Sequence, residues 1–224
     1  SAAPLMSDFY ADLHRDRGVD ILLGTGAVKI EGTGGRACAV LTGNGLRLPA
    51  DLVVVGIGVV PNVELAAACG LAVGNGIAVD EYLRTSDPSI FAIGDCCEFP
   101  SVHAGARVRL ESVQNAVDQA RNVAQAILGK PSVYAATPWF WTDQYDMKIQ
   151  MAGLSTGFDQ THLRGDYKGG KFSLFYFRKG RMIAVDSVNR GTDYMAVRKI
   201  LGGARAVTFD EIADEAVDLK ALAR

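Results

Sequence analysis

Apolar residues near the start of the chain recur every four positions, which is the spacing of one face of a helix. Leu5, Phe9 and Leu13 follow this spacing, and on a helix they form a single apolar stripe. Pro4 suits the first turn of such a helix because the backbone N–H that proline lacks would have no partner there. We therefore expect a helix from Pro4 to about Asp16.

Short apolar runs separated by glycines then predict strands. The expected strands are Val19–Leu23, Val28–Glu31, Ala37–Thr42, Leu46–Leu48 and Leu52–Val55. The last of these is expected to be buried and to end in a loop that contains Gly56 and Gly58. In α/β proteins ligands bind at the carboxyl ends of the strands, so this loop is a candidate binding element.

The clearest helical pattern in the chain spans Glu111–Leu128. Its apolar residues recur at i, i+3, i+4 and i+7 and form one stripe. They are Val113, Ala116, Val117, Ala120, Val123, Ala124 and Ile127. Gly129 and Pro131 stop this helix, and a shorter helix is expected at Glu64–Cys69.

After Pro138 the pattern turns to strands. They are expected at Lys148–Leu154, His162–Gly165, Lys171–Arg178 and Arg181–Val188. Lys179-Gly180 is a tight-turn signal between the last two strands. Helices are expected at Asp193–Leu201 and from Thr208, where Thr208-x-x-Glu211 is a capping box. This last part of the chain is therefore predicted to be a separate α+β unit.

The segment Thr85–Asp95, with the sequence TSDPSIFAIGD, carries the most informative polar group. Ile90–Ile93 is too short for a helix, and its bounds at Pro88 and Gly94 favour a buried strand. Gly94 lets the backbone approach a ligand closely, and Asp95 can accept hydrogen bonds from ligand hydroxyls. A carboxylate repels phosphate but suits a sugar or ribityl diol, which points to a nucleotide cofactor site. The alternative is an aspartate that only caps a turn.

Three segments resemble known flavoproteins. Thr85 with Ala92-x-Gly94-Asp95 resembles the second flavin-binding motif of two-dinucleotide-domain flavoproteins, and the strings ESVQNA at 111–116 and WFWTDQ at 139–144 resemble the ferredoxin reductases of oxygenase systems. The resemblance implies an α/β fold, namely a partial two-dinucleotide-binding-domain flavoprotein with a C-terminal α+β domain. The implied divisions are 1–60 for part of an NAD-binding domain, 61–135 for the second segment of an FAD-binding domain, and 136–224 for the C-terminal domain.

The same resemblance implies electron transfer from NAD(P)H through FAD to an iron–sulfur ferredoxin, with no side chain acting as acid, base or nucleophile. Asp95, beside Gly94, would bind the ribityl chain of FAD. Glu111 and the backbone at Ser112 and Val113 would lie at a helix N-terminus, whose partial positive charge stabilises the electron-rich edge of a reduced flavin. By resemblance Glu111 would also lie near the nicotinamide. The alternative for Glu111 is an ordinary acid in the first turn of a helix.

Two further residues gain a role from the resemblance. Trp141 would lie beside the isoalloxazine and the nicotinamide, although a tryptophan in such a cluster is otherwise most often part of a core. Gly58 would contact the nicotinamide through its backbone, although a plain turn explains it almost as well. Basic residues between Arg164 and Arg181 are candidates for steering an acidic ferredoxin.

A phosphate-binding G-x-G-x-x-G turn does not occur in the sequence. Gly24-Thr25-Gly26 lacks the third glycine and leads into a strand. The chain therefore looks like a C-terminal fragment of a longer reductase, and we expect it to bind FAD weakly or not at all by itself. A non-catalytic interaction fragment and a flavin-dependent disulfide reductase are the alternatives. The second lacks support because no His-Pro-x-x-x-Glu motif is present.

Composition narrows the function further. The net charge of -2 gives no support to nucleic-acid binding, and no apolar run approaches the roughly 20 residues that span a membrane. Four cysteines show no C-x-x-C spacing, which favours reduced thiols in a cytoplasmic protein. A strained disulfide between the adjacent Cys96 and Cys97 is the alternative. With three histidines in the chain, no metal site is indicated.

Overall fold

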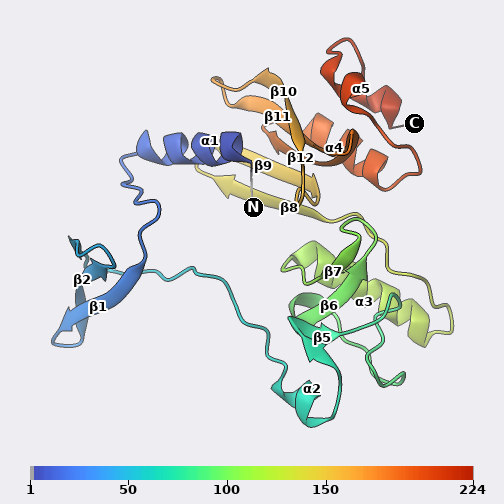
Figure 1. The fold of residues 1–224 in the computed structure, drawn as a ribbon, viewed down its shortest axis with the longest axis horizontal. Helices are drawn as coiled ribbons and strands as arrows, with labels where there is room; N and C mark the ends of the chain where they lie inside the picture. The colour runs from blue at the N-terminus through green and yellow to red at the C-terminus, as the bar shows by residue number, and fades with distance from the viewer. Residues whose placement is uncertain (1–2, 224) are drawn as a thin grey trace. The chain divides into compact units, whose positions relative to one another are not determined.

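The structure is a computed structural model that describes residues 3–223. The chain divides into two compact units between Val60 and Pro61. The first unit contains a helix and a small sheet, and the second contains two further sheets with their helices (Figure 1).

The first unit begins with α1 (Pro4–Arg15), which confirms the predicted helix. It continues with an antiparallel sheet in the order β1-β2-β3. These strands are β1 (Ala27–Thr33), β2 (Arg36–Thr42) and β3 (Arg47–Pro49). The turn between β1 and β2 uses positive φ angles at Gly34 and Gly35, which only glycine adopts without strain.

Two predicted strands of the first unit, Val19–Leu23 and Leu52–Val55, do not form. Within residues 3–223 neither segment pairs with a strand of any sheet. Leu52 is 82% exposed and Val54 86% exposed, so the prediction of burial is also wrong here. A strand is stabilised by its ladder partner, and an apolar run without such a partner stays irregular.

The second unit opens with α2 and a four-stranded sheet in the order β4-β5-β6-β7, in which only β5 and β6 are parallel. The elements are α2 (Glu64–Ala68), β4 (Val73–Gly74), β5 (Gly76–Ala78), β6 (Cys97–Ser101) and β7 (Ala106–Val108). The expected strand Ile90–Ile93 reduces to a single bridge between Phe91 and Arg84. Ile90 is 39% exposed, so this run is not a buried strand.

The helix α3 (Val113–Ile127) turns a polar side inward. Its buried residues are Gln114, Asn115, Gln119 and Val123, and we call the three amides the amide face. Much of the predicted apolar stripe lies outside, with Val113 68% and Ile127 71% exposed. The spacing therefore identified the helix correctly without identifying its buried side.

The rest of the second unit is a five-stranded antiparallel sheet in the order β10-β11-β12-β9-β8. Its strands are β8 (Trp139–Gln144), β9 (Met147–Gly153), β10 (Gln160–Asp166), β11 (Lys171–Arg178) and β12 (Arg181–Val188). The four predicted strands are confirmed. The strand β8 was not predicted, because the string WFWTDQ was interpreted only as a motif.

Three helices follow this sheet: α4 (Gly191–Leu201), α5 (Phe209–Ala213) and α6 (Leu219–Leu222). The helix α4 packs on β9 and β12, which are drawn in yellow and orange beside it (Figure 1). Phe175, Phe177 and Val185 of the sheet share a core with Val197 and Ile200 of α4. The capping box that begins α5 is confirmed, whereas α6 was not predicted.

Replacing Gly153 by alanine should strongly destabilise this sheet. Gly153 has a φ of +82°, and an added Cβ would lie 2.8 Å from Cδ1 of Leu201 and closer still to the backbone oxygen of Ile183. Left-handed strain and overpacking together should lower the free energy of unfolding by about 3 kcal/mol or more. Urea denaturation followed by fluorescence measures this, because both tryptophans lie in β8.

Gly180→Ala is the matched control. Gly180 also has a positive φ, of +74°, but among residues 3–223, its two chain neighbours aside, no atom lies within 4 Å of an added Cβ. Only the backbone strain applies, so the loss should be about 1 kcal/mol. Equal losses in the two variants would contradict the packing explanation.

Candidate cofactor-binding site

Gly94 and Asp95 lie in a 3-10 turn, η1 (Gly94–Cys96), directly before β6. Gly94 is buried with a φ of 77°, and its N–H donates to Oε1 of Gln119 at 2.7 Å. Asp95 is exposed. Among the described residues no group donates a hydrogen bond to its carboxylate. That carboxylate is therefore free to accept bonds from the hydroxyls of a ligand.

Arg109 joins the Gly94–Asp95 turn to Glu111. Its Nη1 donates to the backbone oxygen of Asp95 at 3.0 Å and lies 2.7 Å from Oε1 of Glu111. The Arg109 side chain is only 9% exposed, so solvent screens this ion pair less than a fully exposed one. The sequence interpretation missed Arg109. Arg109 and Glu111 carry opposite charges and lie two residues apart directly after a strand. In extended chain this spacing puts both side chains on the same face, so the sequence does indicate an ion pair between them.

The helix α3 begins at Val113, two residues later than predicted, with Ser112 as its N-cap. Ser112 Oγ accepts a hydrogen bond from the N–H of Asn115 at 3.1 Å. The Val113 side chain is largely exposed, so the first turn is open to a ligand. The partial positive charge of this helix end favours an electron-rich group there. Glu111 thus precedes the helix instead of lying in its first turn.

Trp141 lies on β8 beside the start of α3. It is 49% exposed, and its ring centroid is 5.5 Å from that of Trp139. The backbone N–H of Trp139 donates to Oε1 of Gln114 at 3.3 Å, which attaches β8 to α3. Val113, Trp141 and Arg198 contribute to the lining of one cavity of about 270 Å³. Two predicted site residues, Val113 and Trp141, therefore meet at one place.

The remaining candidates belong to the other unit or have another role. Gly58 belongs to the first unit, where it is exposed with a φ of +93°. Arg164 is 8% exposed, and its Nη2 donates to the backbone oxygens of Glu215 and Val217 at 3.0 and 3.2 Å. The predicted run of basic residues is therefore not one exposed surface, because Arg164 is a buried contact of the fold.

All four cysteines are free thiols, so Cys96 and Cys97 form no disulfide. Cys97 is buried two residues after Asp95, and Nε2 of Gln119 lies 3.9 Å from its Sγ. Burial, with a contribution from Cys96, raises the pKa of the Cys97 thiol to about 12. Cys97 is therefore a packed, protonated side chain and not a nucleophile.

Within residues 3–223 no cluster of histidine, cysteine and acidic side chains could hold a metal ion. Over the same residues no helix is long and apolar enough to cross a bilayer.

Comparison with known proteins gives the family. The model of the pyridine nucleotide-disulphide oxidoreductases matches residues 2–120, and the model described as reductase C-terminal matches residues 139–223. The chain belongs to the pyridine nucleotide-disulphide oxidoreductase family. More narrowly, it is a partial homologue of the ferredoxin reductases of oxygenase systems, of the putidaredoxin and rhodocoxin reductase type.

Rhodocoxin reductase of Rhodococcus erythropolis is 50% identical over 221 residues, which are 98% of this chain and 52% of that protein. The solved ferredoxin reductase for the CYP199A2 system from Rhodopseudomonas palustris is 47% identical with a TM-score of 0.96, over 100% of this chain and 55% of that one. The covalent complex of putidaredoxin reductase with putidaredoxin matches at 45% identity and a TM-score of 0.94, over 99% and 54%. The chain spans about half the length of the relatives it matches.

Cys97 should resist alkylation. At pH 8 a thiol with a pKa of about 12 is a thiolate in roughly one molecule in ten thousand. Iodoacetamide should therefore label Cys97 at least about a hundred times more slowly than the exposed Cys69, as peptide mass mapping will show. The Cys97 rate should keep rising from pH 8 to pH 10 without a plateau. Equal labelling of the two cysteines in the folded chain would refute the assignment.

Proposed function

We propose that this chain works as part of a flavoprotein reductase that passes electrons from NAD(P)H through FAD to an iron–sulfur ferredoxin of an oxygenase system. The observation that carries the proposal is the gathering of polar and aromatic candidates around the start of α3. Gln119 holds the Gly94–Asp95 turn against this helix, Arg109 connects that turn to Glu111, and Trp141 shares a cavity with Val113.

The residues of this site fit a flavin. The unpartnered carboxylate of Asp95 binds the ribityl hydroxyls, and the positive φ of Gly94 keeps the turn compact beside them. The exposed N-terminus of α3 would stabilise the electron-rich edge of the ring system through its partial positive charge. Bound FAD supplies the chemistry that converts a two-electron hydride transfer into single-electron transfers.

The nicotinamide side of the proposed site involves two residues of the second unit. Glu111 is anchored by Arg109 at 2.7 Å and would hold the nicotinamide, while the half-exposed Trp141 would contact the rings of both cofactors. The protein positions both cofactors and contributes no acid, base or nucleophile of its own.

The pyrophosphate of FAD has no partner in this sequence, since no G-x-G-x-x-G turn is present. The site in this chain therefore binds the ribityl and ring portions of the cofactor. This agrees with a chain that spans about half of its relatives. We expect the chain by itself to retain FAD poorly.

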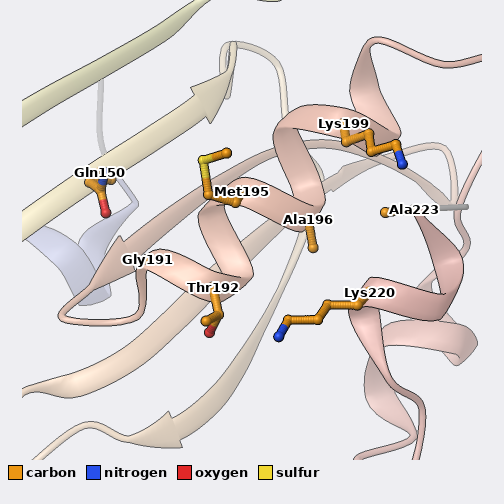
Figure 2. A pocket seen from close by; sticks show the side chains of 8 residues that line it. All are labelled: Gln150, Gly191, Thr192, Met195, Ala196, Lys199, Lys220 and Ala223. Atoms are coloured by element: carbon orange, nitrogen blue, oxygen red, sulfur yellow. The ribbon is translucent and has the colours of Figure 1, made fainter.

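A groove along α4 is the proposed contact surface for the ferredoxin. It has a volume of about 770 Å³, and the residues lining it include two lysines and no carboxylate. Figure 2 shows Lys199 on α4 and Lys220 on α6 on either side of Ala196, with Met195 near Gln150. We call this surface the α4 groove; it is lined by Gln150, Gly191, Thr192, Met195, Ala196, Lys199, Lys220 and Ala223.

The part of the flavin site formed by Trp139 and Trp141 is called its aromatic side. Residues of α4 line both the α4 groove and the cavity on this aromatic side. Lys199 lines the groove, while the preceding residue, Arg198, lines the cavity with Trp141. The Arg198 guanidinium lies 4.6 Å from the centroid of the Trp139 ring. A basic surface of this kind attracts an acidic electron acceptor and orients it close to the flavin. A relative has been solved as a covalent complex with putidaredoxin.

Two other functions remain as alternatives. A disulfide reductase of this superfold carries a C-terminal His-Pro-x-x-x-Glu motif, which this sequence lacks. A non-catalytic interaction module would bind neither cofactor in any longer form of the protein. NADH oxidation with an artificial acceptor separates the proposal from the second alternative. As part of the proposal, the protein works in the cytoplasm, where its four free thiols stay reduced.

Asp95→Asn should weaken FAD binding in the full-length protein. The change removes the charge that strengthens the hydrogen bonds to the ribityl hydroxyls, and the Kd should rise about tenfold. Fluorescence titration with FAD measures this. Asp87→Asn is the control, because Asp87 uses Oδ1 to accept from the N–H of Ser89, a bond that asparagine retains. A D95N protein with unchanged affinity would remove Asp95 from the site.

Reversing charge in the α4 groove should slow ferredoxin reduction. Lys199→Glu and Lys220→Glu together should raise the KM for ferredoxin about tenfold at low ionic strength and less at high salt. The rate with a small neutral acceptor should stay the same. Lys179→Glu, on the turn between β11 and β12, is the control. If K179E had the larger effect, the contact surface would lie on that turn instead.

A further inference from the structure

The amide face of α3 bonds to three separate parts of the second unit. Gln114, Asn115 and Gln119 are 6%, 1% and 0% exposed. Gln119 bonds to the Gly94–Asp95 turn, Asn115 to the segment before the helix, and Gln114 to the start of β8. Buried amides at three positions of one helix face need partners, and each of these partners lies next to a candidate flavin contact.

Gln119 fixes the turn from both ends. Its Oε1 accepts from the N–H of Gly94 at 2.7 Å, and its Nε2 lies 3.9 Å from Sγ of Cys97. Asp95 lies between these two residues in the chain. Because the Gly94 N–H can only donate, the oxygen of the Gln119 amide must face it. No other acceptor for this N–H exists among the bonds of the described residues.

Gln114 has the corresponding role on the aromatic side of the flavin site, where it attaches β8 to α3. Its Oε1 accepts from the backbone N–H of Trp139 at 3.3 Å, and its Nε2 donates to Asp118. Trp141 lies two residues further on β8, on the same face as Trp139. The position of β8 along α3 therefore depends on Gln114 and not on Gln119.

We propose that Gln119 is a positioning residue for the ribityl side of the flavin site and Gln114 for its aromatic side, so that one helix face sets the two sides separately. This inference depends on the proposed function. Without the Gln119 oxygen the buried Gly94 N–H has no partner, so the turn must rotate to reach water. Asp95 moves with it. Loss of Gln114 removes the bond between β8 and α3, whereas the bond from the Gly94 N–H to Gln119 stays in place.

The test compares Gln119→Leu with Gln125→Leu in the full-length protein. Gln125 lies on the same helix but is exposed, so it controls for the change of residue type. We expect Q119L to raise the FAD Kd about 10- to 100-fold and to shift the visible spectrum of any flavin that binds. Q125L should leave both unchanged. Q119E keeps an acceptor oxygen at this position but buries a carboxyl group, so it should recover only part of the affinity.

Two further readouts separate positioning from a general loss of structure. Hydrogen exchange of the Gly94 amide, measured on the 224-residue chain without cofactor, should be at least about tenfold faster in Q119L. Gln114→Leu should change the fluorescence emission of the tryptophans and leave the exchange rate of the Gly94 amide within about twofold of the wild-type rate. Should Q119L fail to fold, Gln119→Ala, which also removes the acceptor oxygen, supplies the same comparison with Q114L.

Q119L with wild-type FAD affinity and spectrum overturns the inference, whatever the exchange rate of Gly94. Equal acceleration of Gly94 exchange in Q114L and Q119L overturns the separation of the two sides. If the wild-type full-length protein bound no FAD, the proposed function itself would fail. The exchange measurement would then still report whether Gln119 holds the turn.

Discussion

The hydrogen bond from the Gly94 N–H to the Gln119 amide is the contact on which the rest of the candidate site depends. It joins residues 25 positions apart inside a region where water does not compete. The neighbouring Asn115 extends the connection, because its Nδ2 donates to Leu110 and its Oδ1 accepts from Tyr134. Leu110 directly precedes Glu111 in the chain. The turn, the approach to the helix and the helix thus behave as one rigid group.

The sheet from β8 to β12 is stabilised differently, by an apolar core with a small polar network. Asp193 is 6% exposed at the start of α4, where its Oδ2 accepts from Ser173 at 2.9 Å and pairs with Arg190 at 2.8 Å. A buried carboxylate is tolerated only with such partners. The network fixes where α4 begins over β11, and therefore where the α4 groove lies.

Local signals in the sequence were reliable because their causes are local. The proline that begins α1, the glycine turn of the first hairpin and the capping box at Thr208 act over a few residues. Leu52–Val55 and Ile90–Ile93 were wrong as strands because a strand needs a partner, and apolar content does not supply one. The inward side of α3 was missed for a related reason, since spacing shows which residues align without showing what covers them.

The residues of the candidate site divide in the same way, into those that a local pattern reveals and those that depend on partners distant in the sequence. Asp95 and Trp141 were named from short motifs, whereas the residues that hold them in place were not. The Gln119–Gly94 bond spans 25 positions, and no spacing rule reaches that far. Arg109 was within reach, because an opposite charge two residues from Glu111 suggests an ion pair. Groups that contact a ligand leave recognisable strings, while those that support them depend on tertiary packing.

The outward apolar side of α3 has a thermodynamic consequence. Val113, Val117 and Ile127 are 68%, 42% and 71% exposed, and covering one such side chain contributes about 1.5–3 kcal/mol. Any surface that covers them binds the folded state alone, so by linkage it also stabilises the helix and the bonds on its inner side. The free energy of unfolding measured on this chain is therefore a lower bound for its value within any assembly that buries this face.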